Sequence, residues 1–438
     1  MLAFRIPYDP LATGSGAGSG QSANGHGPVR EGWHAPLAAG NRPDTHAARK
    51  AQRKAVRRAS LALNFAAAGI ILMGFNRIRI AGWTPSDACF IASMAVIIAD
   101  LLSGRSASLA PKRMRRSSPP ILVATIVLLT AGTLSAFQAF SPATSMGVVL
   151  RLGWILLGFF WVLRAVAPDP ERLMKLLSAW RVMTMLNATI AVTGQLGLTN
   201  FSAPNAENRQ AGFFDQPNEF AGLLVIGIPL FVLGVPRTKE YATDGQELFA
   251  RAWRTAFVVY ALATTGSMTN ILAASVGLLV ALAAGGWRHM RRPGKAYSSP
   301  LLPMVVLLVG ALGIVALANS DLPVVDRFAR YTSGDNYVTG SVNERKSLNA
   351  DVTNNFDQLL VVGRGFSSVT FDDRGRDDSK DNLATHNMHL LLLLQAGLPA
   401  LVALICILGF TASHGIRLVN YTRGSPLHPV AIALLASF

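Results

Sequence analysis

The sequence is short of charged residues, which occupy only 15% of its 438 positions. Soluble domains carry about 25% charged residues, so this deficit argues against a soluble globular protein. Hydrophobic residues make up 51% of the chain. Many of them gather in apolar runs of roughly 18 residues or more, which are long enough to cross a bilayer as helices. The composition therefore predicts an all-α fold, a polytopic transmembrane helical bundle of about 11 or more spans.

Cysteine and the common ligand motifs are also scarce. Only two cysteines occur, Cys89 and Cys406, and both lie in apolar runs, so there is no disulfide framework and no cysteine zinc motif. His386 and His389 stand one helical turn apart, but no His-Glu-x-x-His pattern occurs. The glycine-rich run at 13–20 lacks the following Gly-Lys-Ser/Thr of a phosphate loop. We therefore expect no metal and no cofactor.

Acidic residues are few relative to basic ones. The chain has 24 Asp and Glu residues against 40 Lys and Arg residues, a formal net charge of +16. In a soluble protein such an excess suggests a nucleic-acid partner. Here the basic residues gather in particular short loops, as the positive-inside rule predicts for the cytoplasmic loops of a membrane protein. We therefore expect the membrane, and no nucleic acid, as the partner of these charges.

The apolar runs divide the chain into five parts. The run that begins near residue 427 reaches the end of the sequence, so we expect a truncated last span. The parts are a disordered basic cytoplasmic tail at 1–58, N-terminal transmembrane helices at 59–197, central transmembrane helices at 198–318, a large, partly helical periplasmic loop at 319–385, and C-terminal transmembrane helices at 386–438.

Three segments share the predicted periplasmic face: residues 198–217, the tight turn at 264–270, and the loop at 319–385. A long extramembrane loop between spans is unusual and tends to be functional. Pro217 and Asn218 stand where a helix is expected to begin. Two interpretations of this start stay open. It is either ordinary helix-start chemistry or a helix N-terminus that attracts an anion at the membrane surface.

His386 and Asn387 stand at the start of the apolar run at 387–411. An unperturbed imidazole titrates near neutral pH and can take a proton from a hydroxyl group. An ordinary interfacial histidine is the alternative, and the residues themselves leave both interpretations open. Asn387 can orient the imidazole or begin the helix.

Three arginines on the same face are candidate anion ligands: Arg209, Arg345 and Arg364. A guanidinium group is permanently charged, and its planar fork of N–H donors fits phosphate oxygens. The alternative for each is a solvated or salt-bridged loop arginine.

Five short motifs occur in a fixed order along this face. They are R-x-x-G-F-F-x-x-P-N-x-x-A at 209–221, T-G-S at 265–267, N-E-R at 343–345, G-R-G-F at 363–366, and H-N…Q-A-G-L at 386–398. In their order and spacing they resemble the O-antigen ligase and polymerase superfamily of bacterial integral membrane glycosyltransferases. The resemblance covers roughly residues 180–411.

The resemblance implies an enzyme that transfers a glycan from a polyprenyl pyrophosphate to a hydroxyl group of another sugar, without a nucleotide sugar or an obligatory metal. It implies a bacterial inner-membrane protein with its active site on the periplasmic face. The donor is a lipid-linked glycan, and the acceptor is a glycan or the lipid A core, so ligase and polymerase both stay open. Cations would stabilise the charge on the leaving pyrophosphate, and a base would activate the hydroxyl.

The resemblance also assigns residues to these roles. His386 corresponds to the general base, Arg209 and Arg345 to the arginines that bind pyrophosphate, and Asn218 to the asparagine of the Pro-Asn motif. Further candidate substrate-binding residues are Asn387 and Arg364.

One departure from the family pattern follows the Thr-Gly-Ser turn. Met268 stands there, where family members often have arginine, and Arg364 is a candidate replacement for that charge. Two other functions stay open on the sequence. One is a transporter of anionic solutes or lipid-linked glycans, and the other is a non-catalytic component of a polysaccharide assembly complex. The sequence does not define the oligomeric state.

Overall fold

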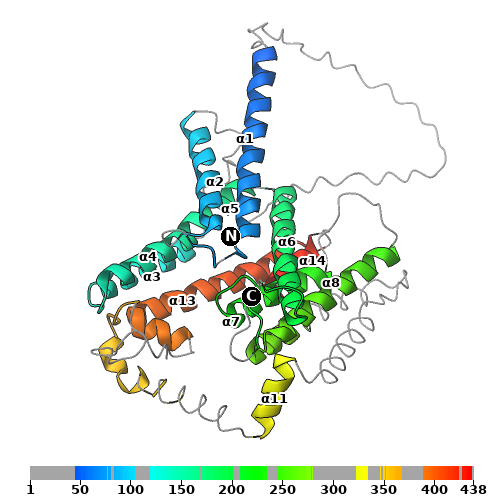
Figure 1. Cartoon of the computed structure of the whole chain (residues 1–438). Helices are drawn as coiled ribbons and strands as arrows, with labels where there is room; N and C mark the ends of the chain where they lie inside the picture. Colours follow the sequence, from blue (N-terminus) through cyan, green and yellow to red (C-terminus); the bar gives the residue numbers. More distant parts are fainter. Residues whose placement is uncertain are drawn as a thin grey trace, which may run out of the picture.

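The regular structure of the described residues is helical, which confirms the all-α prediction (Figure 1). The structure is a computed structural model, and it describes residues 45–75, 77–79, 83–103, 119–167, 169–200, 208–233, 244–277, 279, 322–333, 346, 349–350, 352–366, 388–423 and 427–436. Its elements are α1 (Thr45–Leu72), α2 (Pro85–Leu102), α3 (Pro119–Ala136), α4 (Pro142–Gly153), the π-helical turn η1 (Trp154–Phe159), α5 (Phe160–Val166), α6 (Pro170–Gln195), α7 (Pro217–Leu233), α8 (Asp244–Thr264), α11 (Pro323–Ser333), the 3-10 turn η2 (Phe356–Leu359), α13 (Met388–Tyr421) and α14 (His428–Ala436).

Four helical stretches in this part of the chain are long and apolar enough to cross a membrane: Pro85–Leu102, Pro142–Val166, Pro170–Gln195 and Met388–Tyr421. Shorter apolar helices cover Ala59–Leu72, Pro120–Ala136, Pro217–Val232 and Met268–Gly277. The protein is therefore membrane-associated by its apolar helices. The number of 11 crossings and their orientation stay predictions, partly because the apolar run at 300–318 lies outside the described residues.

Proline marks the start of many of these helices. Its fixed φ suits the first helical turn, where the backbone N–H has no intrahelical partner. Side chains complete two of the starts. Thr84 and Asp87 form a capping box at α2, and the Asp169 carboxylate accepts a hydrogen bond of 2.9 Å from the backbone N–H of Arg172 at α6.

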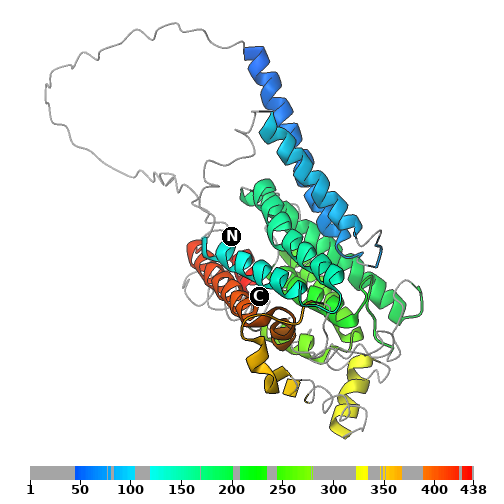
Figure 2. The same cartoon turned by 90° about the vertical axis from the view of Figure 1, so that its left-hand side faces the viewer.

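The first helix differs from the prediction of a disordered tail up to residue 58. Helix α1 begins at Thr45, so the prediction is wrong for residues 45–58. This stretch is rich in alanine, arginine and lysine. These residues are strong helix formers, but they do not form an apolar run. Helices α1 and α2 lie side by side, and one end of the pair extends beyond the other helices (Figure 2).

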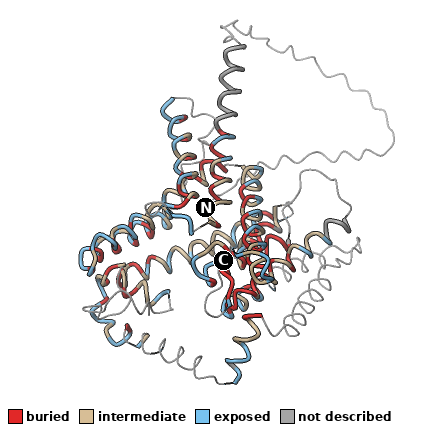
Figure 3. The backbone as a smooth tube through the Cα atoms, in the orientation of Figure 1, coloured by how far each residue is buried: buried red, intermediate tan, exposed pale blue. Residues whose placement is uncertain are grey.

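The largest buried cluster lies where α6, α7 and α8 meet, around Phe220, Leu224 and Phe231, and buried residues are dense there in Figure 3. A second cluster joins α1, α2, α5 and α6 around Phe90. Large apolar side chains are also exposed on the outside of the bundle; Phe137, for example, is 70% exposed. Such an apolar surface is expected where lipid is the solvent.

Helix α13 is broken at Gly397, although the sequence shows one continuous apolar run there. Gly397 has a φ of +82°, which is non-helical and which side-chain-bearing residues rarely adopt. Pro399 then stands at the start of the second half of α13, where its missing N–H costs nothing. The run at 387–411 is therefore two helical pieces and not one straight span.

Candidate functional site

The segment that carries Arg209 is anchored to two other parts of the fold. The backbone N–H of Phe213 donates to Asn187 Oδ1 on α6, at 3.2 Å. The Phe213 carbonyl accepts from the backbone N–H of Arg77 at 3.3 Å. The Phe75 and Phe213 rings stack with their centroids 4.5 Å apart. Gly212 has a φ of +58° and lies against Asn187, so the turn itself depends on a residue without a side chain.

Arg209 is the most buried cation of this region, with 7% of its surface exposed. Its Nε donates to the carbonyl of Thr265 at 2.6 Å, and its Nη2 donates to Asn218 Oδ1 at 2.7 Å. The neighbouring backbone N–H of Gln210 donates to the carbonyl of Thr264 at 3.0 Å. These bonds join the Arg209 segment, the start of α7 and the end of α8. Two of the five motifs, 209–221 and 265–267, therefore meet in space.

The Thr-Gly-Ser segment after α8 forms a turn, as the sequence predicts, and this turn lies against Arg209. Gly266 has a φ of +60°, which explains glycine at this position. A Cβ placed there would lie 3.4 Å from both Cγ and Nε of Arg209 and 3.2 Å from Cβ of Pro323. Met268 begins the next helix and is 39% exposed.

One residue of this cluster, Arg327, belongs to none of the five sequence motifs. It lies on α11 and is half-buried, and its Nη1 donates to the carbonyl of Gly266 at 3.2 Å. A guanidinium group from α11 thus lies at this turn. The alternation of apolar and charged residues at helical spacing in Pro323–Ser333 is the sequence signal that predicts α11. It does not identify the partner of that helix.

A charged pair flanks the start of α7. Arg79 Nη2 lies 2.6 Å from Asp215 Oδ2, and both side chains are nearly half exposed. The pair ties the α1–α2 connection to the segment before α7. As an exposed ion pair it contributes about 0–1 kcal/mol of stability and mainly fixes the local geometry.

Arg364 lies in a second cluster, at the break in α13. The backbone N–H groups of Arg364 and Gly365 donate to the carbonyls of Leu394 and Gln395 at 2.7 and 2.8 Å. Ser135 Oγ of α3 also donates to the Gln395 carbonyl, at 2.7 Å. The broken helix thus finds partners for the carbonyls that lose their intrahelical bonds. The motifs at 363–366 and 386–398 therefore also meet.

The Arg364 side chain donates through Nη2 to Gln358 Oε1, at 3.2 Å. Its assignment as a substrate-binding residue stays a prediction. His386, Asn387 and Arg345 lie outside the described residues, and their roles also stay predictions. His386 precedes Met388, the first residue of α13, by two positions.

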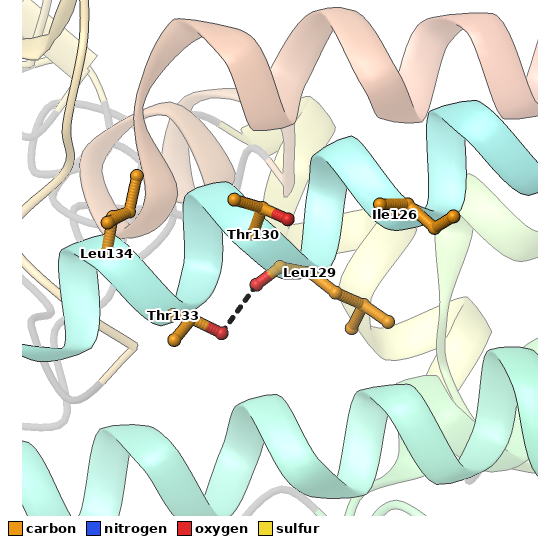
Figure 4. A pocket seen from close by; sticks show the side chains of 5 residues that line it. All are labelled: Ile126, Leu129, Thr130, Thr133 and Leu134. Atoms are coloured by element: carbon orange, nitrogen blue, oxygen red, sulfur yellow. Dashed lines mark hydrogen bonds between the residues drawn. The ribbon is translucent and has the colours of Figure 1, made fainter.

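An apolar hollow lies on α3 and is lined by Ile126, Leu129, Thr130, Thr133 and Leu134 (Figure 4). Thr133 Oγ1 donates to the Leu129 carbonyl of its own helix at 2.8 Å. A hollow lined by these residues offers no cation to an anionic ligand. Among the residues that the structure describes, no group of three or more His, Cys, Asp or Glu side chains is arranged to hold a metal ion.

No known family model and no curated protein matches this chain.

Proposed function

We propose that the protein transfers a glycan from a polyprenyl pyrophosphate to a sugar hydroxyl group at the membrane surface. The observation that carries the proposal is the buried guanidinium of Arg209 between Asn218 and the carbonyl of Thr265. These contacts bring together residues from two motifs that are 44 or more positions apart in sequence (265 − 221 = 44). The membrane association of the apolar helices supports a donor with a polyprenyl tail.

Arginine suits this position because its charge does not depend on pH. The guanidinium cannot deprotonate under physiological conditions, so burial leaves it cationic. Burial also strengthens its attraction for an anion, since the surroundings screen charge less than water does. The bonds to Asn218 and Thr265 fix the orientation of the fork, which makes the group a preorganised anion ligand.

The proposed reaction needs one base and one or more cations. The acceptor hydroxyl oxygen bonds to the anomeric carbon while the bond from that carbon to the bridging pyrophosphate oxygen breaks. The hydroxyl proton passes to His386, and the electron pair of the broken bond leaves with the polyprenyl pyrophosphate. Arg209 stabilises the negative charge that develops on this leaving group. The pyrophosphate is already a good leaving group, so the step calls for no strong general acid.

The test is a transfer assay with purified protein in lipid nanodiscs. The donor is a polyprenyl-pyrophosphate glycan, and both the lengthened or transferred glycan and the released polyprenyl pyrophosphate are measured. We expect H386A to abolish product formation while donor binding persists. We expect R209Q to raise the donor Kd about tenfold to a hundredfold, the value of one or two charge-assisted hydrogen bonds.

The matched control is R417Q, which removes an exposed arginine on α13. It should leave both donor binding and transfer unchanged. Uptake of the lipid-linked glycan into proteoliposomes without any transfer product would contradict the proposal and favour a transporter. Full transfer activity of H386A would refute the role of His386 as the general base.

A further inference from the structure

We infer that residues 359–366 form a shallow re-entrant segment, which enters the bilayer from the side on which α13 begins and contacts lipid acyl chains through Leu360 and Val361. By sequence this stretch belongs to the extramembrane loop predicted at 319–385. The placement requires α13 to cross the membrane, for which it is long and apolar enough. It does not depend on the proposed transfer reaction.

The break in α13 lies inside the bilayer. After Gly397, the first His, Lys, Arg, Asp or Glu is His414, 17 positions later (414 − 397 = 17). A straight helix of that length covers about 26 Å, and tilt reduces the thickness that it crosses. The hydrocarbon core is about 30 Å thick, and an ionisable side chain such as His414 is costly to place within it. Gly397 therefore lies a few ångströms below the surface at which α13 enters.

Residues 361–363 lie directly against this break. A Cβ on Gly397 would lie 3.0 Å from the backbone nitrogen of Gly363 and 3.1 Å from the carbonyl oxygen of Val361. A Cβ on Gly363 would in turn collide with the backbone at Gln395. Backbone therefore meets backbone here, and the depth of the α13 break sets the depth of the segment.

Hydrogen bonds support a non-helical backbone at this depth. In hydrocarbon, backbone polar groups need partners within the protein. The N–H groups of Arg364 and Gly365 donate to carbonyls at the break. The N–H of Phe366 donates to Ser145 Oγ at 2.7 Å, and the Phe366 carbonyl accepts from Gln395 Nε2 at 3.3 Å. At a shallow depth, interfacial water can reach the remaining backbone groups of the segment.

The side chains change from polar to apolar at the same level. Asp357 and Gln358 are exposed polar residues, whereas Leu360 and Val361 are exposed apolar residues, with 43% and 74% of their surface accessible. Arg364 Nη2 donates to Gln358 Oε1 at 3.2 Å, so its side chain extends back to the polar level. Long cationic side chains do the same at the edge of a bilayer. The boundary between water and acyl chains therefore falls between Gln358 and Leu360.

The test is site-directed spin labelling of the full chain in lipid nanodiscs. The native cysteines are removed by C89A and C406A, and a nitroxide is attached to V361C. Its collision rate is measured with oxygen, which concentrates in hydrocarbon, and with a water-soluble nickel chelate. N354C is the aqueous control, because Asn354 is an exposed polar residue of the same segment. V402C is the lipid control, because Val402 is half exposed on the second half of α13.

We expect V361C to behave as V402C does, with more frequent collisions with oxygen than with nickel, and N354C to show the reverse. L360C is a second variant for the same expectation, and size-exclusion chromatography checks that each labelled protein is folded. More frequent collisions with nickel at V361C and L360C would place the segment in water and overturn the inference. Rare collisions with both reagents would mean that another protein surface covers these residues, and would overturn it as well.

A membrane-impermeant maleimide gives an independent readout on the unlabelled cysteine variants. In nanodiscs, V361C should react at least about tenfold more slowly than N354C, because the reagent stays in water and only the thiolate reacts. The difference should vanish when the protein is unfolded in SDS. Equal rates in nanodiscs would contradict the inference. Neither measurement uses transfer activity, so the result is separate from the fate of the proposed function.

Discussion

The turn at Gly266 offers the sharpest test of how the site is built. Two independent structural features favour glycine at this position over any residue with a side chain. One is the φ of +60°, a left-handed conformation. The other is the contact of a Cβ with Arg209 and Pro323 at 3.4 and 3.2 Å. The substitution G266A introduces both costs at once. Gly197 supplies the control, since its φ is +68° and a Cβ there would meet nothing within 4 Å.

The backbone cost of the two variants should be similar. An alanine in the left-handed region costs about 1–2 kcal/mol relative to glycine. Both G266A and G197A should therefore lower the thermal midpoint by a few degrees, measured by scanning fluorimetry in detergent. Only G266A should affect the site. A Cβ contact at 3.2 Å is tighter than ordinary van der Waals packing, so α11 or the Arg209 side chain has to move.

We expect G266A to weaken binding of polyprenyl pyrophosphate about tenfold, because small displacements of a binding group are costly in a preorganised site. G197A should bind as the wild type does. Equal affinity of G266A and G197A for pyrophosphate, at equal stability, would refute the reasoning that this turn positions the arginines.

Three further predictions follow from other contacts. N218D places a carboxylate 2.7 Å from the Arg209 guanidinium, so we expect a higher thermal midpoint and weaker pyrophosphate binding in the same titration; tighter binding would contradict an anion site. N187L leaves a backbone N–H of the Arg209 segment without its acceptor, which should cost about 1–3 kcal/mol of stability and show in the thermal midpoint. G363A drives a Cβ into the backbone at the break of α13 and should abolish folded protein by size-exclusion chromatography, whereas G409A, with nothing within 4 Å, should behave as the wild type.

Much of the cluster around Arg209 could be predicted from local sequence. Proline at 217 predicts the start of α7, and Thr-Gly-Ser predicts a turn, because both depend on backbone preferences that are fixed within a few residues. The predicted membrane topology places Arg209 and Asn218 on the same face of the membrane. Their hydrogen bond, and the one to Thr265, depend on how α7 and α8 pack, which no local pattern encodes.

Two features of the structure were not predicted from the sequence: the break in α13 and the contact of Arg327 with Gly266. The break at Gly397 had a local signal, since glycine and then Pro399 form a helix end followed by a helix start, but the surrounding leucines concealed it within one apolar run. Arg327 had none, because its contact with Gly266 joins residues 61 positions apart. Only the folded arrangement of α8 and α11 brings them together.

The most direct test of the central claim is to locate the lipid pyrophosphate on the protein. The measurement is photo-crosslinking with a polyprenyl pyrophosphate that carries its photoreactive group next to the phosphates, followed by mass spectrometry of the labelled peptides. We predict labels in 208–218, 264–270 and 323–333, and their loss in R209Q. Labels confined to the apolar hollow at 126–134, or labelling that R209Q leaves unchanged, would contradict the claim that Arg209 binds the pyrophosphate.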